Sequence, residues 1–377
     1  MAKVPQHVDV LVLGEHPCAY FAAILLERAG ISVFHSKIPG EQLPDRLISI
    51  NPELFELDEV MRSLKRRVDL ESTYGLKFLA DDPATSNACV RKTIGAYVGS
   101  FRQIQQELAK LAKSAGVAIH SPQHLGFESL DERGVEVVLG GSRVRARLML
   151  LAGQLPVDQQ KLLGLPIWAP DALSRYTFIQ TKASFFEDQG KRPLVQMSLN
   201  LRETHHWAWV LPGPDHLQLA IEQPYQSATA GRSEEHLKHW AQVLESHGVL
   251  KVPVDRLGLD RAVSIVLPLG GALSGEGVAN RTLCIGPAGG FITACAEELY
   301  PSCWSAVCAA EVARAALKER HLQDALQSYR QRWGATLGDY LRGPQQNLRF
   351  LLPLVYRNSA MASRLTDAIL LGKSVVR

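Results

Sequence analysis

Two tryptophans and two histidines stand close together in the run His205-His206-Trp207-Ala208-Trp209. Residues two positions apart on a β-strand face the same side of a sheet, so Trp207 and Trp209 are expected to present their rings together. Two large amphipathic rings on one face can belong to a hydrophobic core or to the wall of a ligand site. His206 can act as a general acid or base, although His205 beside it would point to the opposite face.

The segment 8–37 carries a second pattern with chemical meaning. An apolar run meets Gly14, a helical stretch follows, and another apolar run begins after a glycine break, which together predict a β-turn-α-β unit. Such a unit can place a nucleotide pyrophosphate at the N-terminus of its helix. Only Gly14 of the three expected glycines is present, because His16 and Ala19 occupy the other positions, and the second strand ends in Ser36 instead of a ribose-binding acid. A βαβ unit without ligand is the alternative.

Composition limits the classes of function. The 377 residues allow about two domains, and 41 basic against 38 acidic residues leave too small a charge to predict nucleic-acid binding. Six cysteines without a CxxC pair favour free thiols, and the absence of a leader or an apolar membrane span predicts a cytoplasmic protein. His236 and His239 are three positions apart, but no carboxylate or cysteine pattern joins them, so no metal site is predicted.

The elements that must position these residues are predicted in a definite order. The helix expected over 100–115 is amphipathic and ends at Gly116, and it is followed by an antiparallel meander and then by the apolar strand 148–152. Four strands between 176 and 222 indicate a second, antiparallel sheet, followed by a helix over 233–246. The apolar strand 282–285 and the turn 286–290 then return the chain to the first sheet, before helical sequence from about residue 296.

This order predicts an α/β fold. We expect a three-layer ββα domain of the FAD/NAD(P)-binding kind, with an inserted antiparallel-sheet substrate domain and a helical C-terminus. The expected boundaries are 1–80 with 98–170 and 278–335 for the first domain, 81–97 with 171–277 for the second, and 336–377 for a basic helical segment. That last segment is expected to dock on the body, or to contact a membrane surface or a partner protein.

Three motifs carry a resemblance to a known superfamily. Gly40-Glu41-Gln42-Leu43-Pro44 resembles a GExLP loop, the run 207–212 (WAWVLP) is similar to a WxWxIP motif, and the run 286–291 (GPAGGF) resembles a Gly-Asp-Ala-Ala-Gly-Phe turn. Together they resemble the FAD-dependent oxidoreductases and monooxygenases with a glutathione-reductase-type FAD fold, in the branch of flavin-dependent halogenases and geranylgeranyl reductases. The resemblance covers nearly the whole chain.

The resemblance implies FAD as cofactor and a set of site residues. The cofactor-binding positions are Gly14, His16, Ala19, Ser36, Arg102, Gly286, Ala288, Gly289, Gly290 and Phe291. The catalytic candidates are Trp207, Trp209, His206, Lys77 near the lysine of halogenases, and Glu297 beside their active-site glutamate. An apolar or aromatic small molecule, or a residue of a partner protein, is the implied substrate.

Several residues depart from the superfamily pattern. Glu15 and His16 stand where phosphate would approach the turn, Ser36 replaces the ribose-binding acid, and Pro287 replaces the aspartate that contacts the ribityl chain. Losing four or five hydrogen bonds, each worth about 0.5–1.5 kcal/mol, weakens binding by a factor on the order of a thousand. The sequence therefore predicts a flavin-dependent oxidoreductase with weak FAD binding. The alternative is a protein of this fold that has lost FAD and serves as a binding or scaffolding protein.

Overall fold

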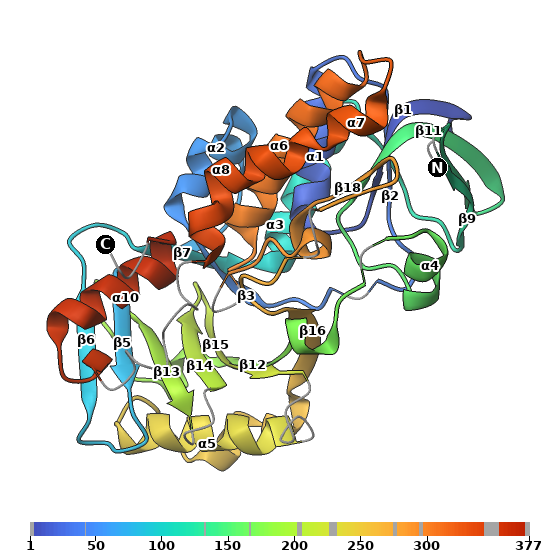
Figure 1. Ribbon diagram of the computed structural model, residues 1–377. Coiled ribbons are helices and arrows are strands. Elements are labelled where there is room, and N and C mark those ends of the chain that lie inside the picture. The colour runs from blue at the N-terminus through green and yellow to red at the C-terminus, as the bar shows by residue number, and fades with distance from the viewer. Residues whose placement is uncertain are drawn as a thin grey trace.

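The computed structural model describes residues 4–373 apart from 42, 132, 166, 202–205, 226–231, 274–276, 294–296 and 343–353. The strands of this part of the chain form three sheets, of eight, seven and three strands. The eight-stranded sheet and its helices form one body, and the seven-stranded sheet forms the other (Figure 1). The predicted α/β fold with a second sheet is confirmed.

The first body is a ββα sandwich. Its main sheet runs in the order β17 (Val278–Ala279), β18 (Thr282–Cys284), β11 (Ser142–Leu151), β1 (His7–Leu13), β2 (Val33–Ser36) and β8 (Ala118–His120). Strands β9 (Leu125–Asp131) and β10 (Gly134–Leu139) continue from β11 as the predicted antiparallel meander. The sequence suggests a separate apolar strand over 148–152 after the meander, whereas β11 is one strand that pairs with both β10 and β1.

Alternate side chains of β1 hold the layers together. Val10 and Val12 pack with the apolar residues of helices α1 (Pro17–Arg28), α3 (Phe101–Ser114) and α6 (Leu299–Ala316). Leu11 and Leu13 point to the other face, where they pack with the meander. Helix α1 is buried on nearly all sides, as its apolar sequence predicts. Pro301 lies in the first turn of α6, where a missing N–H is tolerated.

The second body is built on a seven-stranded sheet. Its order is β16 (Val263–Pro268), β12 (Leu173–Lys182), β15 (His216–Pro224), β14 (His206–Pro212), β13 (Val195–Leu201), β5 (Gly75–Leu79) and β6 (Ser86–Val90). Helix α5 (Ser233–Ser246) covers one face of this sheet (Figure 1). The expected boundary at residue 80 places β5 in the first domain, but β5 pairs in parallel with β13 and belongs to the second sheet.

A small sheet of β3 (Leu47–Ile50), β7 (Ala96–Ser100) and β4 (Leu70–Thr73) lies between the two bodies, beside the short helices η1 (Pro52–Glu56) and α2 (Glu59–Lys65).

The C-terminal part is helical, as expected, with α7 (Leu322–Leu326), α8 (Ser328–Arg342) and α10 (Ser359–Leu371). Helix α10 packs on β5 and β6, and its Asp367 pairs with Arg91. The other short helices are α4 (Val157–Leu162), η2 (Pro170–Ala172), η3 (Ala183–Phe185), η5 (Val254–Leu257), η6 (Leu259–Arg261) and η7 (Gly286–Gly289). None of the helices within the described ranges combines the length and the apolar composition needed to cross a membrane.

Candidate functional site

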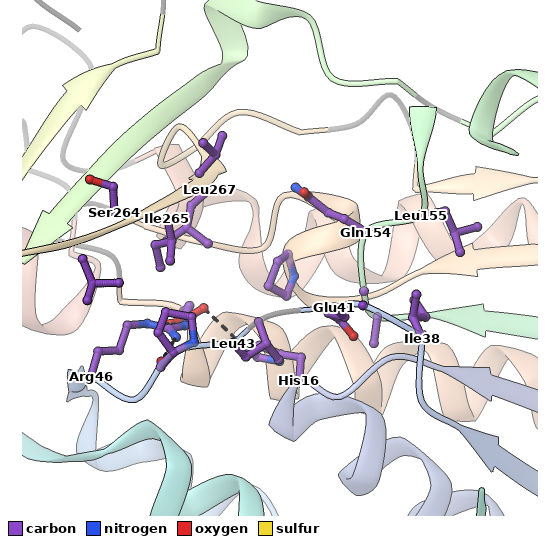
Figure 2. Close-up of a pocket in the computed structure, with 18 of the residues that line it drawn as sticks. His16, Ile38, Glu41, Leu43, Arg46, Gln154, Leu155, Ser264, Ile265 and Leu267 are labelled. Atoms are coloured by element: carbon purple, nitrogen blue, oxygen red, sulfur yellow. Dashed lines mark hydrogen bonds and ion pairs between the residues drawn. The ribbon is translucent and has the colours of Figure 1, made fainter. Parts of the chain in front are cut away.

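A cavity of about 730 Å³ opens between the carboxyl ends of β1 and β11 and the strand β16 at the edge of the second sheet (Figure 2). Open α/β sheets bind ligands at the carboxyl ends of their strands. The apolar surface of the cavity includes Ile38, Leu43, Leu155, Val263, Ile265 and Leu267. Its polar surface includes His16, Glu41, Arg46, Arg102, Gln154 and Glu298. Among the predicted cofactor-binding residues, His16 and Arg102 line this cavity.

Gly14 forms the turn that leads from β1 toward the cavity. Its φ of 121° is unfavourable for other residues, and a Cβ there would lie 2.6 Å from the backbone nitrogen of Gly153. His35, at the end of β2, donates from Nε2 to the Gly14 carbonyl at 2.8 Å, and burial lowers the pKa of His35 to about 4. Gly14 is thus required by the close approach of β1 to the loop after β11, whether or not a ligand binds.

His16 occupies the N-terminus of α1 with its own side chain. Its Nδ1 accepts from the Cys18 backbone N–H at 3.3 Å, so His16 is the N-cap residue of the helix. The ring is 1% exposed, and burial lowers the pKa of His16 below its usual value. The neutral ring therefore carries its proton on Nε2, which lies 3.5 Å from Glu298 Oε2.

Glu41 covers the other backbone donors near the turn. Its Oε2 accepts from the Glu15 backbone N–H at 3.0 Å, and the carboxylate also accepts from the backbone N–H of Gln154. Burial raises the pKa of Glu41 to about 7, although the two hydrogen bonds act to lower this pKa. Lys37, at the end of the β2 segment, forms an ion pair with the carboxylate of Glu15.

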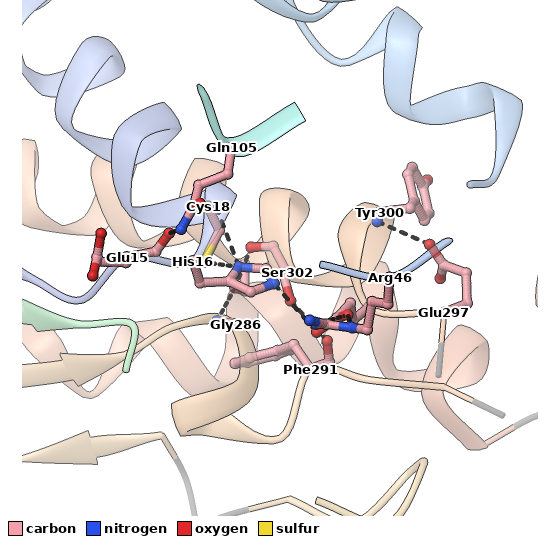
Figure 3. Close-up of polar contacts among 12 residues, drawn as sticks. Glu15, His16, Cys18, Arg46, Gln105, Gly286, Phe291, Glu297, Tyr300 and Ser302 are labelled. Carbon is pink, nitrogen blue, oxygen red and sulfur yellow. Dashed lines mark hydrogen bonds and ion pairs between the residues drawn. The ribbon is translucent and has the colours of Figure 1, made fainter. Parts of the chain in front are cut away.

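A buried ion pair joins the loop before β3 to α6 (Figure 3). Arg46 donates from Nε to Glu298 Oε1 at 3.1 Å, and its guanidinium lies 3.8 Å from the ring centre of Phe101. Arg46 and Glu298 are 1% and 0% exposed. Burial acts to raise the pKa of Glu298, but the charge of Arg46 and the contact with His16 lower it overall, so Glu298 is ionised. The sequence analysis missed both residues, because 252 positions separate them.

The second predicted turn, 286–291, meets α1 from the opposite side. Gly286 donates its backbone N–H to Ser305 Oγ at 3.0 Å, and a Cβ on Gly286 would collide with Cys18. Pro287 lines the cavity, whereas Phe291 packs in the core against Tyr329 and Trp333. The remaining predicted cofactor-binding positions are buried without lining the cavity: Ala19 in α1, Ser36 in β2, Ala288, Gly289 and Gly290 in the turn.

The predicted catalytic residues are not gathered at this cavity. Trp209 is fully buried, and its ring stacks on Tyr176 with centroids 5.4 Å apart, which makes it part of the second core. Trp207 is partly buried against the same core, and Lys77 lies half-buried on β5. The backbone of His206 lies in β14, while its side chain and all of His205 lie outside the described residues.

Glu297 lies in a separate buried polar group behind Glu298. It accepts from the Tyr300 backbone N–H at 3.0 Å and from Tyr340 Oη at 3.0 Å. Burial raises the pKa of Glu297 to about 7 from a usual value of 4.5. Glu297 is therefore protonated over much of the acidic range, and it does not line the cavity.

This raised pKa predicts a pH-dependent stability. Because the folded pKa of Glu297 lies above its unfolded value, its contribution is fully present below about pH 4.5 and is lost as the pH rises through 7. For Glu297 alone the loss is on the order of 3 kcal/mol. Urea unfolding at pH 5 and pH 8 should show a smaller loss for Glu297→Gln than for the unsubstituted protein. Equal pH dependence in the two proteins would contradict this assignment.

The turn does not fit the diphosphate of FAD. Among the backbone groups after Gly14, the N–H of Glu15 is bound by Glu41, Pro17 has none, and the N–H of Cys18 is bound by the His16 ring. These are the donors that a pyrophosphate would use at the N-terminus of α1. A phosphate at the turn would also meet the carboxylate of Glu41, which lines the cavity. The size and the position of the cavity suit a large ligand, but the phosphate contacts are replaced by side chains of the chain itself.

Metal and thiol chemistry are not indicated by this geometry. Within the described ranges, no group of three or more His, Cys, Asp or Glu side chains is placed to hold a metal ion, and His239 lies 3.4 Å from Asp81. Five cysteines are free thiols, and Cys295 lies outside the described residues. Burial raises the pKa of the Cys18 thiol well above its usual value, which leaves it protonated.

Comparison with known proteins supports the fold. No protein-family model and no curated protein sequence matches the chain. Among solved structures, PqsL from Pseudomonas aeruginosa in complex with 2-aminobenzoylacetate matches with a TM-score of 0.67 and 18% identity, over 94% of this chain and 100% of PqsL. PqsL is described elsewhere as a probable FAD-dependent monooxygenase.

Two further structures are similar along nearly the whole chain. The flavin-dependent brominase Bmp2 matches with a TM-score of 0.67 and 15% identity, over 97% of this chain and 94% of Bmp2. A geranylgeranyl bacteriochlorophyll reductase-like protein from Thermoplasma acidophilum matches with a TM-score of 0.66 and 14% identity, over 98% of this chain and 89% of that protein. The chain therefore has the fold shared by FAD-dependent monooxygenases, flavin halogenases and geranylgeranyl-reductase-like proteins.

Proposed function

We propose that this chain is an oxidoreductase of the flavin-dependent type that binds FAD weakly. The observation that carries the proposal is the cavity of about 730 Å³ at the carboxyl ends of β1 and β11, in a fold that flavin-dependent enzymes share. Leu43, Ile265 and Leu267 make much of its wall apolar, which suits an apolar or aromatic small molecule or a side chain of a partner protein. The occupied donors of the turn support weak binding of the diphosphate.

A titration with FAD tests this proposal. Because several phosphate contacts are replaced, we expect a Kd in the micromolar range or above, about a thousand-fold weaker than a nanomolar flavoprotein. Purified protein should release flavin during dialysis and gain thermal stability when excess FAD is added, since a ligand at about 100 times its Kd stabilises by about 2.7 kcal/mol. Colourless protein with no thermal shift in excess FAD would contradict the proposal.

The second candidate function is that of an FAD-free binding protein. The group formed by His16, Arg46 and Glu298 favours it, because these buried side chains bridge the N-termini of α1 and α6 where the cofactor of this fold would cross. This candidate predicts no response to FAD or riboflavin, but a thermal shift with apolar ligands that fit the cavity. The same titration series therefore separates the two functions.

A further inference from the structure

The carboxylate of Glu41 sits where a ligand phosphate would bind. It accepts from the backbone N–H of Glu15, which follows β1, and from that of Gln154, which follows β11. Its side chain also lies directly over Gly153, where a Cβ would collide with the Glu41 carboxylate. Glu41 is thus held against the ends of the two central strands, in the cavity that His16 also lines.

A carboxylate and a phosphate compete for the same kind of site. Both are anions with several acceptor oxygens, and both bind backbone N–H groups at a strand-to-helix turn. An ionised Glu41 occupies the backbone N–H donors of Glu15 and Gln154. It also repels a second anion, because like charges at short range in a partly buried site are weakly screened. A ligand without phosphate meets neither obstacle.

We propose that the Glu41 carboxylate occupies the anion site of the β1 turn and excludes ligand phosphate from it, which makes Glu41 a specificity-determining residue of the cavity. This inference rests on the cavity being the ligand site of the proposed function. The cavity then selects nucleosides, riboflavin-like molecules and other uncharged ligands over their phosphorylated forms.

The charge of Glu41 makes this exclusion dependent on pH. Burial and the nearby carboxylate of Glu15 favour the neutral form, while the two backbone hydrogen bonds and the ammonium of Lys37 favour the charged form. Cys18 and Tyr20 also sense its charge, and both have pKa values raised well above neutrality and stay uncharged. With the pKa of Glu41 at about 7, phosphate exclusion is stronger at pH 8 than at pH 6.

Binding of ADP and adenosine tests the exclusion without any flavin. By calorimetry at pH 8, Glu41→Ala should bind ADP at least tenfold more tightly than the unsubstituted protein, with adenosine changed by less than twofold. Glu41→Gln keeps the shape and removes the charge, so the change in its ADP affinity between pH 6 and pH 8 should be smaller than that of the unsubstituted protein, and what remains comes from the titration of the ADP phosphate itself. Glu56→Ala, which removes an exposed glutamate on η1, is the control and should leave both affinities unchanged.

The outcomes separate this proposal from the proposed function. Unchanged ADP affinity in Glu41→Ala, with the fold confirmed by thermal unfolding, overturns the role of Glu41. An equal gain in affinity for ADP and adenosine also overturns it. The gain would then come from the volume freed by the smaller side chain and not from admission of the phosphate. A selective gain for ADP, with no binding of FAD or riboflavin by any variant, supports the role of Glu41 and contradicts the flavin-dependent function.

Discussion

Replacing Glu298 with glutamine is expected to lower the free energy of unfolding by about 3–5 kcal/mol, because it leaves the buried guanidinium of Arg46 without a compensating charge. Both side chains are almost fully buried, so water cannot replace the lost partner. Urea unfolding at neutral pH measures the change directly. The matched control is Glu107→Gln, whose partner Lys110 is exposed on α3, and whose loss should cost no more than about 1 kcal/mol.

A double variant distinguishes the cost of an unpaired charge from the net value of the pair. Replacing Arg46 with methionine and Glu298 with leucine removes both charges at similar volume, and the double variant should be much more stable than Glu298→Gln. A double-mutant cycle with the two single changes then gives the coupling energy. If Glu298→Gln alone cost less than about 1 kcal/mol, the pair would have to be accessible to water, contrary to its burial.

Replacing Trp209 with alanine is expected to cost about 3–5 kcal/mol, because it opens a large cavity in the core of the second sheet. The ring is fully buried and stacks on Tyr176, which in turn stacks on Phe178. Trp207→Ala is the matched control on the same strand, and its partly buried ring should cost about 1 kcal/mol. Chemical unfolding of both variants measures the difference.

This comparison also decides between the two roles that the sequence allowed for the tryptophan pair. If Trp209 formed the wall of a ligand site, truncating it would lower the ligand affinity and change the stability of the protein little. If Trp209 is a core residue, truncating it lowers the stability of the protein first. A stable Trp209→Ala protein with impaired ligand binding would overturn the assignment to the core.

The fold was predictable where the pattern is local. The apolar period of α3, the apolar run of β1 and the turn glycines of the meander each define an element within a short window, and the structure confirms them. The partner of β5 was not predictable, because its pairing with β13 joins segments more than a hundred residues apart. The pattern of a strand indicates that it must pair with another strand, but it does not indicate which strand is the partner.

The candidate site was predictable in part for the same reason. The turn at Gly14 and the loss of its glycines are visible in the sequence, and His16, which replaces one of these glycines, lines the observed cavity. The function of the replacing side chains was not visible, because His16 as a helix cap and Glu41 as an acceptor depend on backbone groups of other segments. Arg46 and Glu298 carry no motif at all, and only the folded chain brings them together.

The side-chain cap that His16 provides for α1 has a consequence for how the protein is made. A dinucleotide-binding turn with free N–H groups leaves part of helix stabilisation to the cofactor, so folding and cofactor supply are linked. Here the helix end is satisfied by the chain itself, through the His16 ring on the Cys18 N–H. The newly synthesised chain can therefore form the N-terminal cap of α1 without a cofactor.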